Sequence, residues 1–294
     1  MLIYILSRSE TLYTTKRIYQ AGINRKHNVR VINYMECDLL IEDGKHKIVY
    51  EHEFLMVPDA VIPRIGSSVT SYGCTVVRHF ERMGAMVYNK SEGILNSRDK
   101  FRSLQMLSKA GIKIPKTYFS YDLYYAERVV REHLGYPFVL KVLEGTQGQG
   151  VYLIEGEEQA VDFFNDFNER KTRIILQQYI SEFKGKDIRV IVIGNKVVAT
   201  MMRVAAEGDF RSNIHRGGKG ETVLLSENEK EIAINSLHVL GLEMGGVDIL
   251  RSETGAMIIE VNSSPGFEGI EGVTKHGIAE ELIMAIENKY NHDN

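Results

Sequence analysis

The stretch GGVDILRSETGAMIIEVNSSPG, residues 245–266, has the pattern of two short apolar strands joined by a turn. Three oxygen-bearing side chains interrupt that pattern, at Asp248, Glu260 and Asn262. Strand side chains alternate between two faces, so Ile258, Glu260 and Asn262 are expected on one face. Carboxylate and amide groups within apolar strands indicate a site with chemistry of its own, built on a hairpin.

The turn decides which residue faces Asp248. A loop of residues 254–255 alone would place Asp248 opposite Val261. A three-residue loop of residues 253–255, with glycine at its left-handed third position, would place Asp248 opposite Glu260. We predict the second register.

Two carboxylates that face each other across a hairpin repel each other, so a cation is expected between them. Oxygen ligands without histidine or cysteine suit Mg²⁺, Mn²⁺ or Ca²⁺. A sparse set of Asp248, Glu260 and Asn262 suits a metal–nucleotide complex, and two ions bridged by Glu260 are compatible with it. The alternative is a hairpin with a polar face in solvent.

A glycine-rich loop, EGTQGQG at residues 144–150, lies between two segments that resemble strands. Its backbone N–H groups can approach an anion closely, which predicts a flap over phosphates. It is neither a P-loop nor a dinucleotide-binding fingerprint. Lys141 precedes it in an apolar strand, where a charge needs a partner or a ligand. The alternative for Lys141 is the outer face of an edge strand. Lys100, at the start of a predicted helix, is a second phosphate candidate because a cation there opposes the helix dipole.

Cationic and polar residues gather between these features. Two of them alternate with apolar residues in strands and the rest lie in a glycine-bounded loop: Arg189, Arg203, Arg211, Asn213, His215 and Arg216. Fixed donors of this kind stabilise charge that develops on phosphoryl oxygens. Surface salt bridges are the alternative for each arginine alone.

The first hundred residues alternate strand and helix signals, which predicts a small parallel α/β sheet. Ligand sites of such sheets lie in the βα loops, and this brings Ser7, Arg8, Arg64 and Gly66 into view. A helix is predicted from Ser97 to Ala110, followed by two α+β units. The second unit contains a hairpin about residues 194–195.

The composition excludes several classes of protein. With 294 residues, 44% hydrophobic and 26% charged, the chain is long enough for about two globular domains. A net charge of −3 argues against direct nucleic-acid binding. No stretch is apolar enough for a membrane, and Cys37 and Cys74 have no metal or disulfide spacing, which favours the cytoplasm. G-x-S-x-G, H-E-x-x-H and C-x-x-C are absent.

These motifs together resemble the ATP-grasp ligases, and more narrowly the RimK-type α-L-glutamate ligases. The resemblance is carried by RDK (98–100), LKVLEGTQGQGV (140–151), LQQYI (176–180), DIR (187–189), EGDFRSNIHRGG (207–218), GVDIL (246–250) and IIEVNSSPG (258–266), with SRSETLYTTKR and DAVIPRIG nearer the N-terminus. It implies an α/β and α+β fold class, with an N-terminal small parallel α/β domain followed by a two-subdomain ATP-grasp fold. The expected division is 1–95, 96–181 and 182–294.

The resemblance also implies roles for particular residues. ATP would be bound by Lys100, Lys141, Gly145, Thr146, Gln147, Gly148, Gly150, Gln178, Tyr179, Ile180, Asp187, Arg211, Ser212 and Asn213. Asp187 would reach the ribose, and Gln178 stands where similar proteins usually carry Glu. Mg²⁺ or Mn²⁺ would be held by Asp248, Glu260 and Asn262. Arg203, Lys141 and Arg211 would act in catalysis, and Arg8, Arg64, Arg189, His215 and Arg216 would contact substrates.

The implied reaction activates an acceptor carboxylate as an acyl phosphate, which the amine of L-glutamate attacks to give an amide, ADP and phosphate. It needs no covalent enzyme intermediate, in agreement with the missing nucleophile motifs. The expected acceptor is a protein or peptide, in particular the C-terminus of a small-subunit ribosomal protein. A small-molecule or carrier-protein carboxylate, as in lysine-biosynthetic or coenzyme-glutamylating relatives, is the alternative, and a non-catalytic nucleotide-binding regulator is a third. A homo-oligomer, dimer or tetramer, is compatible with the resemblance.

Overall fold

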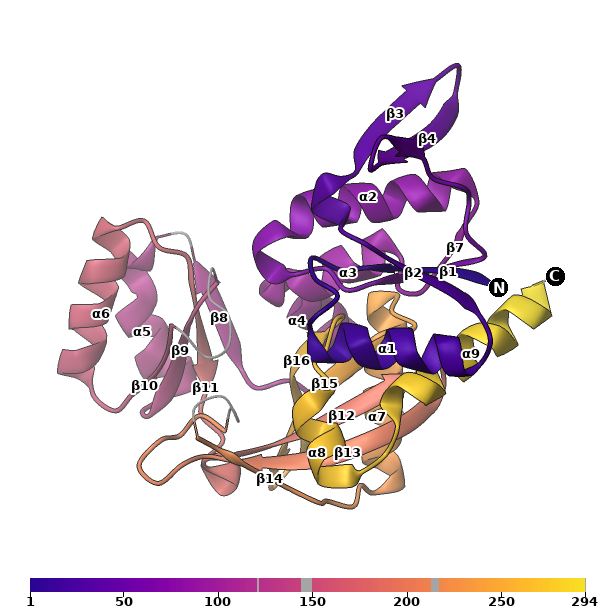
Figure 1. Ribbon diagram of the computed structural model, residues 1–294. Helices are drawn as coiled ribbons and strands as arrows, with labels where there is room; N and C mark the ends of the chain where they lie inside the picture. The colour runs from indigo at the N-terminus through magenta and orange to yellow at the C-terminus, as the bar shows by residue number, and fades with distance from the viewer. Residues whose placement is uncertain (121, 144–149, 213–216, 294) are drawn as a thin grey trace.

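The computed structural model describes residues 1–120, 122–143, 150–212 and 217–293. Three sheets with their covering helices form an N-terminal, a central and a C-terminal part, and a small fourth sheet projects from the first (Figure 1). The central part stands beside the other two, which are stacked on each other (Figure 1). Short turns outside the main elements are η1 (Tyr34–Glu36), η2 (Ser67–Val69), η3 (Leu123–Tyr125), the π-helical η4 (Val130–Leu134) and η5 (Ser181–Phe183).

The N-terminal sheet is parallel, as predicted, with strand order β2-β1-β6-β7. Its strands are β1 (Leu2–Leu6), β2 (Asn28–Ile32), β6 (Ala60–Pro63) and β7 (Met86–Val87), and its main helices are α1 (Tyr13–Asn24) and α2 (Thr70–Met83). Ile3 and Ile5 pack towards α1, while Tyr4 and Leu6 pack towards α2. Both faces are therefore buried, as a parallel sheet requires.

A three-stranded antiparallel sheet, β3 (Asp38–Glu42), β4 (Lys45–Tyr50) and β5 (Glu53–Phe54), projects from the N-terminal part (Figure 1). The sequence pattern does not predict this sheet. Strands β3 and β5 are mostly exposed, so the alternation that marks a half-buried strand is weak in them.

The helix predicted from Ser97 begins later than expected. Helix α3 (Ser91–Arg98) ends and α4 (Lys100–Lys109) starts on either side of Asp99, whose carboxylate accepts a hydrogen bond from the Arg102 backbone N–H at 3.0 Å. This N-cap interrupts the helical path and places Lys100 at the first position of α4.

The central sheet is antiparallel with order β10-β9-β11-β8. Its elements are β8 (Thr117–Ser120), β9 (Phe138–Val142), β10 (Val151–Ile154), β11 (Ile174–Gln178), α5 (Ala126–Val129) and α6 (Glu157–Glu169). Phe138 and Leu140 pack against the helices. Lys141 faces the other side of β9, which is an interior strand and not an edge.

The C-terminal sheet has order β14-β13-β12-β15-β16 and is antiparallel throughout. It contains β12 (Lys186–Ile193), β13 (Lys196–Val204), β14 (Lys219–Glu221), β15 (Met244–Ser252) and β16 (Gly255–Asn262), with α7 (Glu227–Leu240), α8 (Glu268–Thr274) and α9 (Ile278–Asp293). The predicted turn at residues 194–195 joins β12 to β13. Helix α7 covers one face, and α8 and α9 cover the other.

Helix α9 joins the C-terminal sheet to the N-terminal part. Ile283 and Ile286 of α9 share one hydrophobic core with Ile18 of α1 and with Ile191 of β12. Burial of large aliphatic side chains contributes about 1.5–3 kcal/mol each, so this shared core holds the two parts together. Across residues 1–120, 122–143, 150–212 and 217–293, no helix is both long and apolar enough to cross a bilayer.

The register of the hairpin formed by β15 and β16 is confirmed at the polar residues, but the turn that was expected to set it is wrong. Asp248 faces Glu260. Near the turn, however, Ser252 pairs with Gly255, so the loop has two residues, and an irregularity after Asp248 restores the predicted register. Ile258 consequently lies on the buried face, and it does not share a face with Glu260 as predicted.

Candidate active site

Four charged residues form one buried network on the face of the C-terminal sheet that α8 and α9 partly cover. Asp187 faces Arg203 across β12 and β13, and Arg189 faces Asp248 across β12 and β15. Each facing pair is bidentate: Arg203 reaches Asp187 at 2.5 and 2.8 Å, and Arg189 Nη2 reaches Asp248 at 2.7 Å while its Nε donates to the other oxygen. Arg203 Nη2 also donates to Asp248 at 2.8 Å, which joins the two pairs.

The network fixes the charge state of its members. Burial would raise the pKa of Asp248, but the guanidiniums of Arg189 and Arg203 outweigh it and hold that pKa below its ordinary value. Burial would lower the pKa of Arg203, but Asp248 and Asp187 together raise it. Both groups are therefore ionised at neutral pH.

This geometry bears on the roles predicted for Asp187 and Arg189. Both oxygens of Asp187 accept hydrogen bonds within the network, including one from the Ser212 hydroxyl. In the described geometry Asp187 orients Arg203, and a contact with ribose would have to share these oxygens. Arg189, predicted as a substrate residue, is bound to Asp248.

Glu260 and Asn262 lie next to the network on the outer strand β16. Among the described residues, no hydrogen bond or ion pair engages the exposed Glu260 carboxylate, although it faces the buried Asp248. Asn262 Oδ1 accepts a hydrogen bond from the Ser264 backbone N–H at 3.0 Å and keeps a second lone pair.

These donors fit a hard cation. Mg²⁺ takes one or two carboxylates and completes its shell with water and phosphate oxygens, so Glu260 and Asn262 suffice as a protein contribution. Asp248 would join them by sharing an oxygen that an arginine already holds. The described residues contain no cluster of three or more His, Cys, Asp or Glu side chains suited to a metal ion.

Two lysines of the predicted phosphate site lie together. Lys141 Nζ donates to Gln177 Oε1 at 2.6 Å, and Lys100 Nζ approaches the Val142 carbonyl at 3.4 Å. Burial lowers the pKa of Lys141, the Lys100 charge lowers it further, and the charge of Glu260 opposes both. Lys141, on the central sheet, is thus in the electrostatic field of Glu260, on the C-terminal sheet.

The glycine flap is described only at its borders. Strands β9 and β10 pair with Lys141 opposite Val151, which confirms that a hairpin carries the loop. Gly150 has φ of +73°, and a Cβ there would lie 2.9 Å from Val142 Cβ. Gly145, Thr146, Gln147 and Gly148 lie outside the described residues, as do Asn213, His215 and Arg216.

The remaining nucleotide residues lie where the central and C-terminal parts meet. Gln178 ends β11, and its backbone N–H donates to the Lys116 carbonyl at 2.8 Å. Ile180 is buried, and Tyr179 has a buried hydroxyl with no partner among the described residues. Arg211 is bidentate to Asp209, at 2.9 and 3.0 Å, and its Nη1 approaches the Val151 carbonyl at 3.4 Å, beside the flap.

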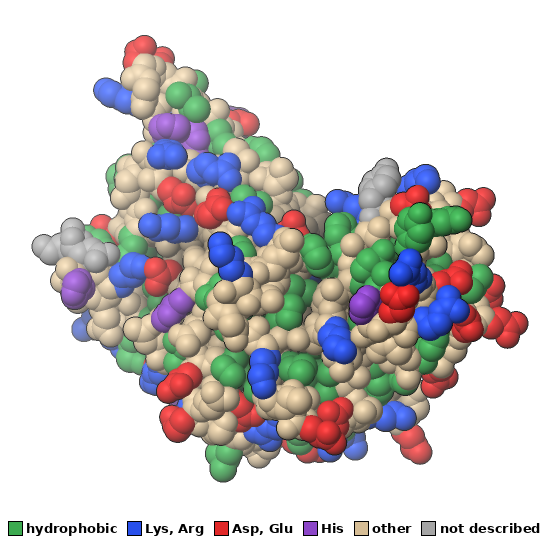
Figure 2. Space-filling model, turned by 180° about the vertical axis from the view of Figure 1, so that it is seen from behind, with side chains coloured by type: hydrophobic (Ala, Val, Ile, Leu, Met, Phe, Trp, Pro, Cys, Tyr) green, Lys and Arg blue, Asp and Glu red, His purple; other side chains and the backbone are tan. Residues whose placement is uncertain are grey.

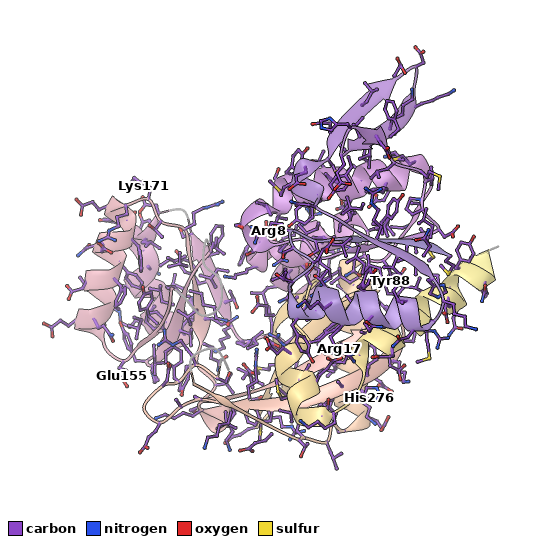
Figure 3. The ribbon with its side chains drawn as sticks, viewed as in Figure 1. Arg8, Arg17, Tyr88, Glu155, Lys171 and His276 are labelled. Carbon is purple, nitrogen blue, oxygen red and sulfur yellow. The ribbon has the colours of Figure 1, made fainter. Side chains whose placement is uncertain are left out.

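The N-terminal part contributes three arginines to the same region. Arg8 and Arg64 follow β1 and β6, and Figure 3 shows Arg8 on the side of the N-terminal part that faces the central part. Arg98, at the end of α3, was not predicted; the RDK motif that begins at this residue is the signal that could have found it. Arg64 Nη2 donates to the Pro265 carbonyl at 2.5 Å, and Arg98 Nη2 donates to the Ile65 carbonyl at 2.6 Å.

Asn89 holds the N-terminal part against the hairpin of β15 and β16. Its Nδ2 donates to the carbonyls of Met244 and Ser263 at 2.8 and 3.0 Å, and its Oδ1 accepts from the backbone N–H groups of Glu243 and Met244 at 2.7 and 2.9 Å. Every hydrogen-bonding position of this buried amide is used, which positions the segment after Asn262. Sequence reasoning missed Asn89, because its partners are 154 residues or more away along the chain.

Solved structures with the same fold cover the whole chain. The chain superposes with a TM-score of 0.78 and 18% identity on the ATP-grasp ligase PsnB in complex with a minimal precursor, Mg and ADP, over 99% of this chain and 98% of that one. It superposes with a TM-score of 0.77 and 14% identity on the macrocyclase MdnC of Microcystis aeruginosa bound to the precursor peptide MdnA, over 98% and 100%. The fold is therefore that of the ATP-grasp ligases.

The particular family follows from the sequence matches. Residues 97–286 match the model of the RimK-like ATP-grasp domain, and residues 1–94 match that of the RimK PreATP-grasp domain. A probable alpha-L-glutamate ligase of Vibrio vulnificus is 50% identical over 287 residues, 98% of this chain and 95% of the relative. Another, of Syntrophotalea carbinolica, is 47% identical over the same shares. The chain belongs to the RimK-like ATP-grasp family and is an ATP-dependent ligase.

Proposed function

We propose that this protein forms an amide between a carboxylate of a protein or peptide acceptor and the amine of L-glutamate, through an acyl phosphate. One observation carries the proposal: the partly buried ammonium of Lys141, bonded to Gln177 at 2.6 Å and close to Lys100, faces the charges of Glu260 and Asp248 across the junction of two sheets. This arrangement suits a metal–nucleotide complex held between cations on one sheet and oxygens on the other.

The proposed nucleotide is ATP. Lys100 and Lys141 would bind its phosphates beneath the flap of residues 144–150. Within the flap, Gly145, Thr146, Gln147 and Gly148 would contact the nucleotide. The segment from Gln178 to Ile180 would offer backbone groups to the adenine. Arg211, Ser212, Asn213 and Asp187 would complete the site. The residues are proposed to be organised as units 1–95, 96–181 and 182–294, with the nucleotide between the second and third.

The proposed metal is Mg²⁺ or Mn²⁺, held by Glu260 and Asn262 with Asp248. When bound, a divalent ion neutralises charge on the phosphoryl oxygens. Arg203 lies against both Asp187 and Asp248, so it is held rigidly and can present its remaining N–H groups to a phosphoryl group without reorganising. The network of Asp187, Arg189, Arg203 and Asp248 would thereby position Arg203 for its proposed catalytic role.

The donor and the acceptor rest on relatives. The two relatives at 47–50% identity are named probable alpha-L-glutamate ligases, which supports glutamate as the amine. Solved structures of the same fold hold precursor peptides, which supports a peptide acceptor. Within that class, the C-terminus of a small-subunit ribosomal protein is the acceptor we propose first, with Arg189, His215 and Arg216 near it.

Formation of ADP tests the reaction. The wild-type protein with ATP, Mg²⁺, glutamate and an acceptor peptide should release ADP only when both glutamate and acceptor are present. Glu260→Gln keeps the side-chain shape and removes the charge, so it should abolish that release while the protein stays folded. Turnover in Glu260→Gln equal to wild type would refute the metal assignment, and turnover with another amine but none with glutamate would refute the donor.

A further inference from the structure

Two partly buried arginines, Arg64 and Arg98, lie at the carboxyl edge of the N-terminal sheet without an acidic partner in the part of the chain that the structure describes. Among the described residues, no Asp or Glu oxygen lies within 4 Å of the guanidinium of Arg8, Arg64 or Arg98. Burial, together with the charge of Arg98, lowers the pKa of Arg64 to about 10. Burial lowers the pKa of Arg98, against the charge of Glu260. Each of these two arginines has one guanidinium nitrogen that is buried without a partner among the described residues, and a cation pair held partly out of solvent without a counter-ion is costly, which indicates that an anion belongs there.

Hydrogen-bonding atoms without partners point to the same place. Arg64 Nη1, Arg98 Nε and the hydroxyls of Ser263 and Ser264 are buried and make no hydrogen bond within residues 1–120, 122–143, 150–212 and 217–293. They belong to one cluster, because Arg64 donates to Pro265, the residue after Ser264, and Arg98 donates to Ile65, the residue after Arg64. Buried polar atoms are normally satisfied, so several orphans in one cluster indicate a missing ligand.

The topology supports a ligand at this position. Strand β1 leads to α1 on one face of the sheet and β6 leads to α2 on the other, so the chain diverges between these adjacent strands. Ligands of open parallel sheets bind outside the carboxyl ends of the strands at such a point. Arg8 and Arg64 follow the ends of β1 and β6, and Arg8 is the exposed member.

The chemistry of the cluster selects a carboxylate. Guanidinium N–H groups only donate, and serine hydroxyls can donate, so the pocket offers donors to a group that only accepts. A carboxylate meets this requirement and fits the fork of an arginine. A carboxamide would place an NH₂ group against these donors and be rejected.

The position relative to Glu260 indicates whose carboxylate it is. Lys141 and Arg98 both lie in the field of Glu260, Lys141 on the central part and Arg98 on the N-terminal part. If phosphates occupy the Lys141 side, the amine must approach the acyl phosphate from the other side. Resting on the proposed function, we infer that Arg64, Arg98, Ser263 and Ser264, with Arg8 at the solvent side, bind a non-reacting carboxylate of the incoming glutamate.

The kinetic test uses Arg98→Gln, with Arg102→Gln as matched control. Arg102 is an exposed arginine of α4 paired with Glu92. Loss of a charged hydrogen bond should raise the KM for glutamate roughly ten- to hundredfold, with the KM for ATP unchanged. Wild type should prefer glutamate to one of its two monoamides, glutamine or isoglutamine, and this identifies the bound carboxylate. Arg98→Gln should lose that preference, and Arg98→Lys should recover part of it.

Ser263→Ala is a second test variant that should fold normally, because it removes a buried hydroxyl that has no partner among the described residues. It should raise the KM for glutamate with unchanged thermal stability. The inference would be overturned if Arg98→Gln, Ser263→Ala and Arg102→Gln had the same KM for glutamate and the same preference for glutamate over its monoamides.

Binding of glutarate separates this inference from the proposed function, since it needs no turnover. Calorimetric titration should show glutarate binding to wild type and Arg102→Gln, and none to Arg98→Gln. Glutarate binding lost in Arg98→Gln would support the pocket even if no acceptor gave ADP. Normal ligation of glutamate with equal glutarate affinity in all three proteins would overturn the pocket and leave the proposed function standing.

Discussion

Asp248→Asn tests whether the buried network stabilises the C-terminal sheet. Asp248 is 2% exposed and accepts hydrogen bonds from two arginines, so the substitution removes a buried charge that has two cationic partners. Breaking a buried ion pair costs about 3–5 kcal/mol. The asparagine keeps one acceptor oxygen and Arg203 keeps Asp187, so the lower end, about 3 kcal/mol, is expected.

Urea unfolding followed by circular dichroism measures this loss as a lower midpoint at unchanged slope. The matched control is Asp166→Asn, which removes an exposed i,i+4 pair with Arg170 and should cost less than about 0.5 kcal/mol. The pH dependence adds a second signature. The folded pKa of Asp248 is below its ordinary value, so its contribution is present at neutral pH and is lost as pH falls below about 4. Equal midpoints for Asp248→Asn and Asp166→Asn would refute this reasoning.

Three further outcomes are expected. Burial lowers the pKa of Lys141 in the folded protein, so the unfolded chain binds more protons just below pH 10.5. The free energy of unfolding of wild type should therefore rise with pH relative to that of Lys141→Met. A difference in unfolding midpoints that does not change with pH would contradict this. Gly150 has φ of +73° and lies against Val142, so Gly150→Ala should destabilise the protein by about 1–2 kcal/mol. Gly272 in α8 has open space around it, so Gly272→Ala should be neutral or stabilising. Equal unfolding midpoints for the two variants would contradict this expectation. Burial raises the pKa of Cys37 to about 12 and that of Cys74 to about 11, so both thiols should resist Ellman's reagent at pH 8 until urea unfolds the chain; rapid reaction of the native protein would show that they are accessible.

The sequence predicts the local parts of this site better than the long-range ones. Asp248 opposite Glu260 is confirmed because one hairpin holds both, even though the loop is shorter than predicted and an irregularity restores the register. Ile258 was assigned to the wrong face because simple alternation cannot include that irregularity. Lys141 interrupts an apolar strand and was predicted to need a partner or a ligand; it lies on an interior strand and donates a hydrogen bond to Gln177.

Other contacts depend on pairings that the sequence does not reveal. Arg189 was expected near substrate and Asp187 near ribose, yet both belong to the ion network, which arises because β12 pairs with β15 across some 50 intervening residues. Arg98 was missed because its partner, the Ile65 carbonyl, follows a strand of another layer. Figure 2 shows a hollow in the surface between the central part and the rest of the molecule, and its shape also depends on how three sheets meet.

Mass spectrometry of a small-subunit ribosomal protein incubated with the enzyme, ATP, Mg²⁺ and glutamate tests whether the protein ligates glutamate to a protein acceptor. Mass increments of whole glutamate residues are expected at the acceptor's C-terminus, formed with one ADP per increment and absent with Glu260→Gln. An unmodified acceptor, while the same enzyme releases ADP with a small-molecule carboxylate, would contradict the protein-directed function.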